Sequence, residues 1–275
     1  MSAAMRPDGD AVHAEPETLG LLRGRAPGQS VMEELLAAHA DRPRRRFLAR
    51  VLGVHPLGPE ERPWYWGALG ERTVGRILGE LGPEWTVLHA VPVGDKSADI
   101  DHVVIGPTGV FTLNTKRHVD QRVWTAKGAF MVSGTRYPYV RTSEHEAVRA
   151  GKLLSAAVRH EVSAGAAIVV VGARQVTVKE KHRSVAVLTP HQLLPWITRR
   201  PGIYTEEQVA LLASAAAQPS TWRRRPEPLR TAAEVVGSFE ALHRTVEQAR
   251  RRRIGWVLAA PAAVVASVAG GLPPF

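Results

Sequence analysis

Residues 99–116 constrain the fold more strongly than any other part of the chain, because they encode two strands separated by a tight turn. Residues 100–105 and 110–115 are rich in apolar and β-branched side chains, and a Gly-Pro-Thr-Gly turn lies between them. If the hairpin closes symmetrically, Ile105 lies opposite Val110 and the other pairs follow in register. The sequence therefore predicts an antiparallel hairpin.

The open end of this hairpin gathers four polar side chains. Counting outward from the turn places Asp101 opposite Asn114 and Asp99 opposite Lys116. Because side chains alternate between the two faces of a strand, all four project from the same face. Carboxylate, amide and main-chain carbonyl oxygens are the ligands that Mg²⁺ prefers, and an ammonium group stabilises charge developing on a phosphate. A surface ion pair between Asp99 and Lys116 is the structural alternative, and the spacing alone leaves both interpretations open.

A glutamate on the preceding helix adds to this set. Residues 64–81 repeat apolar side chains with a helical period, and Glu71 precedes Val74 by three residues and Leu78 by seven. This spacing places Glu71 on the buried stripe of the helix, where a charged group is rare unless it is paired or bound to a ligand. The alternative is an exposed first turn in which the helix dipole favours Glu71.

The rest of the central segment alternates between strands and helices. A Ser-x-x-Glu capping box at Ser143 and Glu146 predicts the start of a helix that runs to about Glu161. Further strands are predicted at residues 86–93, 122–125, 130–133, 167–171 and 184–188, and a short helix at residues 189–197. The mixed order of these elements predicts an α/β fold with a mixed sheet.

Composition shifts divide the chain into four parts. Residues 1–60 are predicted to be an N-terminal arm, mostly disordered with one short helix, and residues 61–204 the α/β domain. Residues 205–253 are predicted to be a helical region with an Arg/Pro-rich linker, and residues 254–275 an apolar tail.

The charge balance favours a polyanionic partner. The net charge is +10, and arginine clusters stand at residues 42–46, 223–225 and 250–253. Such a surface attracts nucleic acid or anionic lipid. Arg117, Arg149 and Lys152 are candidates for phosphate contacts, with a solvated face as the alternative. The absence of cysteine excludes a thiol nucleophile and any cysteine-ligated metal site.

The C-terminal tail predicts contact with a membrane. Residues 254–272 carry no charged side chain, and an arginine block stands directly before them. This segment nearly matches the ~20 residues needed to span a bilayer, and the positive-inside rule would keep the arginine block in the cytoplasm. We therefore expect a cytoplasmic protein anchored to the inner face of the cell membrane. A disordered tail or a helix docked on the core is the alternative.

Three segments resemble the nuclease-related domain family, NERD. They are Gly-Ala-Leu-Gly-Glu71, Trp85-Thr-Val-Leu-His, and the run from Asp99-Ile-Asp-His to Asn-Thr-Lys116, and the resemblance extends over about residues 67–171. This family is similar to the PD-(D/E)xK nucleases. The resemblance therefore implies a restriction-endonuclease-like fold, with a mixed central sheet flanked by helices.

The same resemblance implies roles for individual residues. Glu71 would be the helix acid, and Asp101 would ligate Mg²⁺ or Mn²⁺ together with the main-chain carbonyl of Thr115. Lys116 would position the attacking water. The carboxylate expected two residues before the lysine is replaced by Asn114, which can ligate a cation but brings no charge. Asp99, on the same face, is the candidate to supply it.

Three functions follow from these observations. The first is a metal-dependent nuclease that acts on nucleic acid, with DNA as the favoured substrate. The second is a catalytically weak or inactive module that binds nucleic acid or protein. The third is a scaffold tethered to the membrane, where the tail performs the main role.

Overall fold

The computed structural model describes residues 22–43, 45–94, 98–224 and 230–270, with side chains described up to residue 259. Residues 1–21, predicted to be disordered, and the last residues of the tail lie outside this part. The helices are η2 (Leu22–Gly24), α1 (Gln29–Ala40), α2 (Phe47–Val51), α3 (Arg62–Leu78), α4 (Tyr139–Val158), α5 (Pro190–Thr198), α6 (Glu206–Ala217), α7 (Pro219–Trp222) and α8 (Ala232–Gly270). The strands are β1 (Thr86–Pro92), β2 (Asp99–Gly106), β3 (Gly109–Arg117), β4 (Arg122–Ala126), β5 (Ala129–Val132), β6 (Thr135–Tyr137), β7 (Ala164–Val171), β8 (Gln175–Val178) and β9 (Val185–Leu188).

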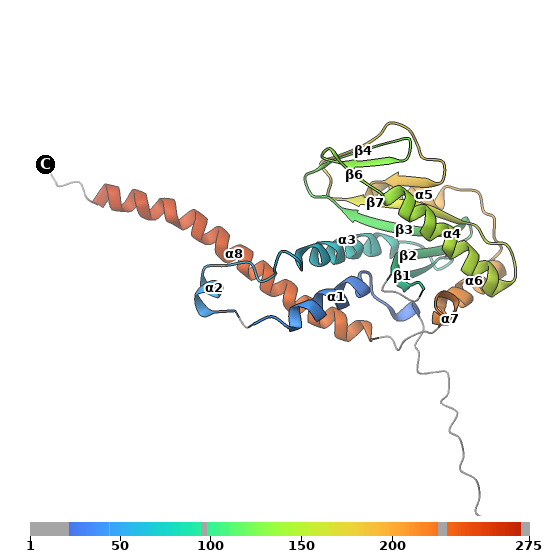
Figure 1. The fold of residues 1–275 in the computed structure, drawn as a ribbon, viewed down its shortest axis with the longest axis horizontal. Helices are drawn as coiled ribbons and strands as arrows, with labels where there is room; N and C mark the ends of the chain where they lie inside the picture. Colours follow the sequence, from blue (N-terminus) through green and yellow to red (C-terminus); the bar gives the residue numbers. More distant parts are fainter. Residues whose placement is uncertain (1–21, 44, 95–97, 225–229, 271–275) are drawn as a thin grey trace, which may run out of the picture.

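The main sheet is mixed, as predicted. Its order within the described residues is β1-β2-β3-β7-β9. The first three strands run antiparallel, while β7 and β9 are parallel to β3. Ile105 lies opposite Val110, so the predicted register of the β2–β3 hairpin is confirmed. Helices cover both faces of this sheet (Figure 1), and the prediction of a mixed α/β fold with flanking helices is confirmed.

Different helices cover the two faces. Val74 of α3 and Leu193 of α5 pack in one core cluster with Leu113 of the sheet. Leu154 of α4 and Leu212 of α6 pack in another, which contains the side chains of the opposite face of β2 and β3. Since the two faces alternate along β3, residues 113 and 115 point towards α3, and residues 114 and 116 point towards α4.

A second sheet of order β6-β5-β4-β8 packs beside the first. The predicted hairpin around Lys127-Gly128 forms its centre, and both turn residues have positive φ, as a two-residue hairpin turn of type I′ requires. Strands β6 and β8 were not predicted from the sequence. Val123 and Phe130 of this sheet share a core cluster with Ile168 of β7, so the second sheet extends the α4 side of the molecule.

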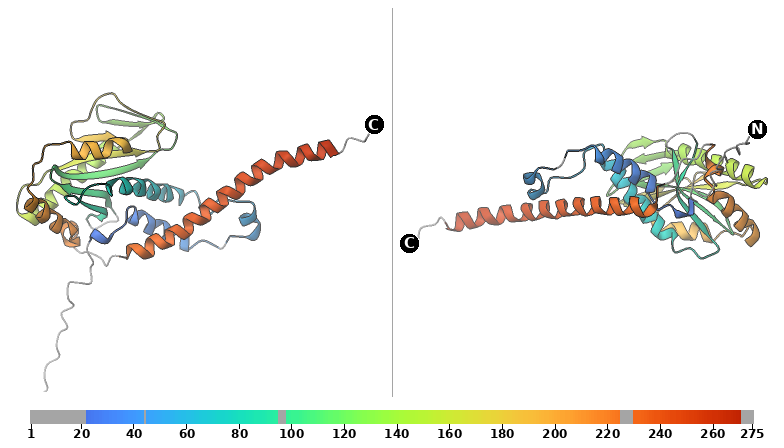
Figure 2. Two further views of the ribbon diagram at one scale, coloured as in Figure 1. Left: turned by 180° about the vertical axis from the view of Figure 1, so that it is seen from behind. Right: turned by 90° about the horizontal axis from the view of Figure 1, so that it is seen from below.

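A three-helix cluster closes the other side of α3. Tyr65 of α3, Met32 of α1 and Phe239 of α8 are fully buried in one apolar cluster. The Tyr65 hydroxyl lies 2.7 Å from Nδ1 of His243, so α8 is also held by a polar contact. Because α1 and α8 both cover α3, segments near the two ends of the chain join the core of the folded body (Figure 2).

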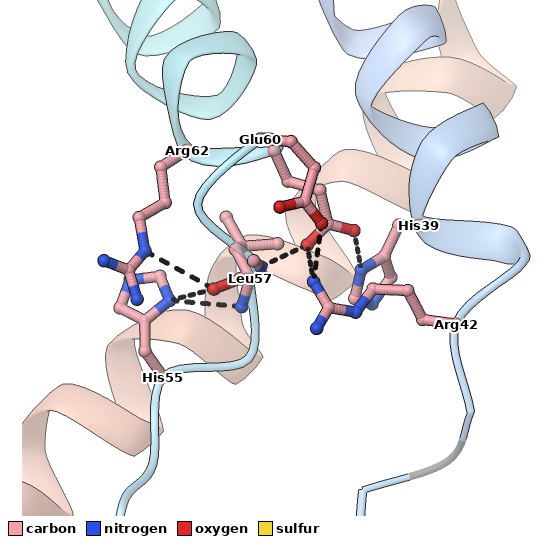
Figure 3. Close-up of polar contacts among 8 residues, drawn as sticks. His39, Arg42, His55, Leu57, Glu60 and Arg62 are labelled. Atoms are coloured by element: carbon pink, nitrogen blue, oxygen red, sulfur yellow. Dashed lines mark hydrogen bonds and ion pairs between the residues drawn. The ribbon is translucent and has the colours of Figure 1, made fainter.

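Glu61 holds the end of α1 to the start of α3. Its carboxylate is 1% exposed, accepts a hydrogen bond from Arg42 Nη1 at 2.6 Å and lies 2.9 Å from His39 Nδ1. The Gly58 N–H also donates to it, in the network that surrounds Leu57 (Figure 3). Burial alone would raise the pKa of Glu61, but these donors outweigh burial and lower the pKa.

The last helix continues beyond the body of the molecule (Figure 2). Residues 205–253 were predicted to be a helical region followed by an apolar tail, and α8 crosses this boundary without a break, from Ala232 through Pro261 to Gly270. Within the described residues, no helix is long and apolar enough to cross a membrane. Most of the predicted anchor, from residue 260 onward, lies outside the residues whose side chains are described.

Candidate functional site

The open end of the β2–β3 hairpin is the centre of the candidate site. The backbone N–H of Thr115 donates a hydrogen bond of 2.6 Å to Asp101 Oδ2, which fixes the Asp101 carboxylate against β3. The side chains of Asn114 and Lys116 project towards α4. In the parallel pairing of β3 with β7, Asn114 lies opposite Ile168 and Lys116 opposite Val170. The paired part of the hairpin ends at His102 and Leu113, so the predicted pairs of Asp101 with Asn114 and Asp99 with Lys116 lie beyond the observed ladder. Asp101 nevertheless contacts Thr115 and lies near enough to Lys116 for their charges to interact.

Ala90 interrupts β1 directly beside Asp101. His89 pairs with His102 and Val91 with Ile100, so Ala90 stands opposite Asp101 without a ladder pairing of its own. Its φ is 48°, in the left-handed region that non-glycine residues rarely adopt. Backbone conformations of this kind cost energy and persist only where the surrounding packing holds them. They are concentrated at functional sites.

Glu71 reaches this region from α3. It is 4% exposed, and this confirms its predicted place on the buried side of the helix. Burial, together with the negative charges of Asp101 and Asp99, raises its pKa well above the usual range, while Lys116 lowers it. Within the described residues Glu71 Oε2 has no hydrogen-bond partner. The fold thus holds a buried carboxyl group with one oxygen atom that lacks a hydrogen-bond partner among the described residues.

The two aspartates of β2 are shifted in the same direction. Burial is the largest cause for each and raises both pKa values to about 6. Asp101 adds repulsion to Asp99, whereas the positive charge of Lys116 acts against the rise at Asp101. Asp99 Oδ2 also lacks a hydrogen-bond partner among the described residues. The site therefore concentrates negative charge that the protein alone only partly compensates.

The N-terminal segment contributes to the site, and this was not predicted from the sequence. The Ser30 hydroxyl and the positive charge of Arg25 lower the pKa of Asp99, and the Gly28 backbone does the same for Glu71. A Cβ at Gly28 would lie 3.2 Å from the carbonyl oxygen of Ala68, so the turn before α1 packs directly on α3. No local signal in the sequence marks this contact, because it joins segments about forty residues apart.

Glu146 is the second contributor that was not predicted from the sequence. The predicted capping box is wrong: α4 begins at Tyr139, and the buried Ser143 Oγ makes no hydrogen bond within the described residues. Instead, Asn114 Nδ2 donates to both carboxylate oxygens of Glu146, at 3.1 and 3.0 Å. The helical repeat of buried residues, with Ala147 and Ala150 facing the core, is the signal that could have placed Glu146 beside the sheet.

Lys116 lies among these acids. Its positive charge lowers the pKa of Asp101, Glu71 and Glu146. Its Nζ also lies 4.9 Å from the ring centre of Tyr139, at the start of α4. This contact holds the ammonium group at the rim of the acidic cluster.

The residues predicted to contact phosphate lie at different depths. Arg117 is partly buried and stacks on Trp66 of α3, with 4.4 Å between the guanidinium carbon and the ring centre. Arg149 and Lys152 are exposed on α4, one and two turns after Glu146. Arg149 lies close to Gly94, next to the end of β1. A basic surface thus adjoins the acidic cluster, and its contact with nucleic acid stays a prediction.

The acidic cluster offers few carboxylates to any one cation. In the described part of the chain, no three Asp, Glu or His side chains are placed to ligate one metal ion together. Mg²⁺ does not require such a cage, because it keeps several waters and uses one or two carboxylates. The unpartnered oxygen atoms of Glu71, Asp99 and Asn114 and the raised carboxyl pKa values fit a cation of this kind.

The fold and site define a mixed α/β protein with a buried acidic cluster beside a lysine at the end of a central hairpin. Residues 66–171 match the model of the family described as the nuclease-related domain, and this range contains every acidic residue of the cluster. The chain therefore carries a nuclease-related domain.

A bacterial relative shares a short part of the chain. An uncharacterized protein of Bacillus anthracis is 43% identical over 76 residues, which is 26% of this chain and 36% of that protein. The chain thus spans about a third of the length of this relative. No solved structure matches the chain.

Proposed function

We propose that this chain is a metal-dependent nuclease that hydrolyses phosphodiester bonds in DNA, built on a restriction-endonuclease-like central sheet. One observation carries the proposal: Glu71, Asp99, Asp101 and Glu146 are held close enough to perturb one another's pKa values, with Lys116 among them. A protein that needed only stability would gain by replacing such buried like charges with apolar groups. Perturbed carboxyl groups of this kind are typical of functional sites.

The residues present allow a division of roles. Asp101, the amide oxygen of Asn114 and the main-chain carbonyl of Thr115 would hold Mg²⁺ or Mn²⁺, and Asp99 and Glu71 would add negative charge. When bound, such an ion lowers the pKa of a coordinated water and stabilises charge on a phosphate. Lys116 would orient the attacking water and neutralise the developing negative charge on the phosphate oxygens.

The basic surface supports a nucleic acid substrate. Arg149 and Lys152 on α4 and Arg117 at the end of β3 would contact phosphates on either side of the scissile bond. Phosphate contacts position a substrate but carry no sequence information. We therefore expect cleavage with little sequence preference and an affinity that falls with salt.

Nicking of supercoiled plasmid tests this proposal. The experiment uses the full chain, because α1 and α8 complete the core around α3. We expect cleavage with Mg²⁺ or Mn²⁺ that is lost in Lys116→Ala and in Asp101→Asn, while the exposed control Asp120→Asn cuts like the wild type. Equal cutting by all four proteins would identify a contaminating nuclease. If wild type does not cut but still binds DNA in a gel-shift assay, the chain is a binding module and the enzyme proposal is wrong.

A second proposal concerns the end of α8: attachment to an anionic membrane surface, without a span. Trp256 and Leu258 are exposed on α8, and Trp256 lines one hollow together with the exposed Phe47 of α2. The arginine block at residues 250–253 lies about one turn before them. Trp256 Nε1 donates to the Val51 carbonyl at 2.9 Å, so both helices present one surface. Apolar and aromatic groups next to arginines are typical of segments that lie in the bilayer interface.

Vesicle co-sedimentation tests this attachment. We expect the full chain to sediment with vesicles that contain about 30% phosphatidylserine and not with pure phosphatidylcholine, because anionic lipid attracts the arginine block. Truncation after Ala249 removes the proposed surface on α8 and should abolish sedimentation. Equal sedimentation of the truncated and full chains would contradict the proposal.

A further inference from the structure

Asn114 occupies the position of the central hairpin, two residues before Lys116, where the resemblance to the nuclease family implies a carboxylate. It is 6% exposed and its Oδ1 has no hydrogen-bond partner among the described residues. Because the amide of Asn114 is neutral, β3 contributes no carboxylate to the proposed ion, and Asp101 of β2 is the charged ligand from the hairpin. The site therefore lacks a negative charge at this position of β3, although the position is buried and polar.

The missing charge is present on the neighbouring helix. Both oxygens of Glu146 lie within 3.1 Å of Asn114 Nδ2, although the two residues are 32 positions apart in the sequence. Glu146 is the residue before Ala147, which is buried against the sheet, so the packing of α4 directs this side chain towards β3. A carboxylate is thus present within hydrogen-bond distance of the Asn114 amide, on α4 and not on β3.

A purely structural role does not explain why a charged side chain stands at position 146. It does not cap α4, which begins seven residues earlier. Within the described residues, no arginine or lysine approaches it closely enough to form a salt bridge. Burial raises the pKa of Glu146 and Asp99 adds repulsion, while the hydrogen bond from Asn114 and the charge of Lys116 act against the rise. A hydrogen bond to Asn114 alone could be made by a neutral glutamine without that repulsion.

We propose that Glu146 supplies the carboxylate that Asn114 lacks, and that Glu146 and Asp101 together ligate the divalent cation, with Asn114 holding Glu146 in place. This inference rests on the proposed function, and it assigns the ligand set of that site. Two carboxylates from different elements, completed by water, are the number that a magnesium ion uses. The arrangement places one ligand on the sheet and one on α4, so the cation would tie the helix to the hairpin.

Binding of Mn²⁺ to the full chain, followed by electron paramagnetic resonance of the free ion, tests the assignment without reference to activity. Glu146→Gln keeps the size of the side chain and a hydrogen bond to Asn114, but removes the charge. We expect it to bind Mn²⁺ at least ~10-fold more weakly than wild type, because even indirect partners of a metal ligand contribute 10- to 100-fold. The exposed Glu161→Gln, three residues beyond the end of α4, serves as the matched control and should bind like wild type.

An exchange of the two groups separates ligation from a merely structural contact. The double variant Asn114→Asp/Glu146→Gln returns the carboxylate to the strand and the amide to the helix, with both side-chain sizes and the net charge unchanged. We expect it to regain Mn²⁺ binding to within ~10-fold of wild type. Thermal unfolding in EDTA completes the comparison: Glu146→Gln should melt at or above the wild-type temperature, because burial disfavours the charge that the substitution removes.

The outcomes are distinct. Weak binding by Glu146→Gln with recovery in the double variant supports the assignment. Binding by Glu146→Gln equal to wild type overturns it and leaves the proposed nuclease function standing with other ligands. A lower melting temperature of Glu146→Gln in EDTA, without recovery of binding in the double variant, also overturns it and assigns Glu146 a structural role. If wild type itself binds no Mn²⁺, the proposed metal-dependent function fails, and this assignment fails with it.

Discussion

Replacing Asp99 by asparagine should stabilise the metal-free protein, and the gain should grow with pH. Burial and the charge of Asp101 raise the pKa of Asp99 from 3.8 to about 6. A raised carboxyl pKa means that the native state holds the proton more tightly than the unfolded chain. Stability is therefore lost as the pH rises from about 4 through about 6, and the full penalty remains above that range.

The magnitude follows from the same two values. Each pH unit is worth about 1.4 kcal/mol, so a rise from 3.8 to about 6 costs at most about 3 kcal/mol at pH 8 and about half of this at pH 5. Asp99 is partly exposed, and solvent screening reduces these figures. We expect Asp99→Asn to be about 1.5 kcal/mol more stable than wild type at pH 8, which corresponds to a melting temperature about 3–6 °C higher.

Thermal unfolding in EDTA at pH 5 and pH 8 measures this difference. Asp120→Asn is the matched control, because Asp120 is exposed in the turn after β3 and should show no such gain. A lower melting temperature for Asp99→Asn at pH 8, or a gain that is larger at pH 5 than at pH 8, would refute the reasoning. Either result would mean that Ser30 and Arg25 neutralise the Asp99 carboxylate more completely than its burial allows.

Three further substitutions test the packing that holds the site. Glu61→Gln should lower the free energy of unfolding by about 2 kcal/mol near pH 7, because it removes a buried charge bound by Arg42. The pKa of Glu61 is lowered, so this difference, measured by urea unfolding, should shrink as the pH falls through that pKa. Gly151→Ala should lower the melting temperature by several degrees, because the new Cβ would lie 2.8 Å from the Val162 carbonyl oxygen and push α4 away from β7. An unchanged melting temperature would show that the helix can shift to make room. Thr205→Ala should cost about 1 kcal/mol in denaturant unfolding, because Thr205 caps α6 through the N–H of Gln208, and a cost near zero would mean that the helix frays there in any case.

The parts of the site that could be predicted from the sequence are those set by local geometry. The turn at residues 106–109 determines the register of β2 and β3, and strand alternation then places Asp101, Asn114 and Lys116 on one face of the sheet. The helical period of α3 likewise puts Glu71 on the buried side. These inferences need only contacts between residues that are close in the sequence or linked by a single turn.

The parts that could not be predicted depend on contacts between distant segments. Ser143 and Glu146 satisfy a local capping pattern, but the packing of α4 against the sheet directs Glu146 to Asn114 instead. The same holds for the turn at Gly28, which meets α3, and for β8, which pairs with β4 across about fifty residues. A local motif is a weak prior when tertiary contacts compete for the same side chain.

The boundary of the folded unit is a further consequence of such contacts, and truncation tests it. The segment after residue 204 looks separable in the sequence, yet Val235, Phe239, Leu242 and Val246 of α8 are buried against α1 and α3. Burial of side chains of this size contributes about 1.5–3 kcal/mol each, or about 6–12 kcal/mol together as an upper limit. This is comparable to the whole stability of a typical domain, which is about 5–15 kcal/mol.

We therefore expect a chain that ends at Arg230 to unfold far below the full-length protein, and to expose apolar surface that binds a hydrophobic dye. A chain that ends at Ala249 keeps all four buried side chains and should melt within a few degrees of full length. Thermal unfolding by circular dichroism compares the three proteins. If the chain ending at Arg230 melts like the full chain, α8 only rests on the domain and does not stabilise it. Since α3 carries Glu71, the loss of α8 should also disturb the acidic cluster.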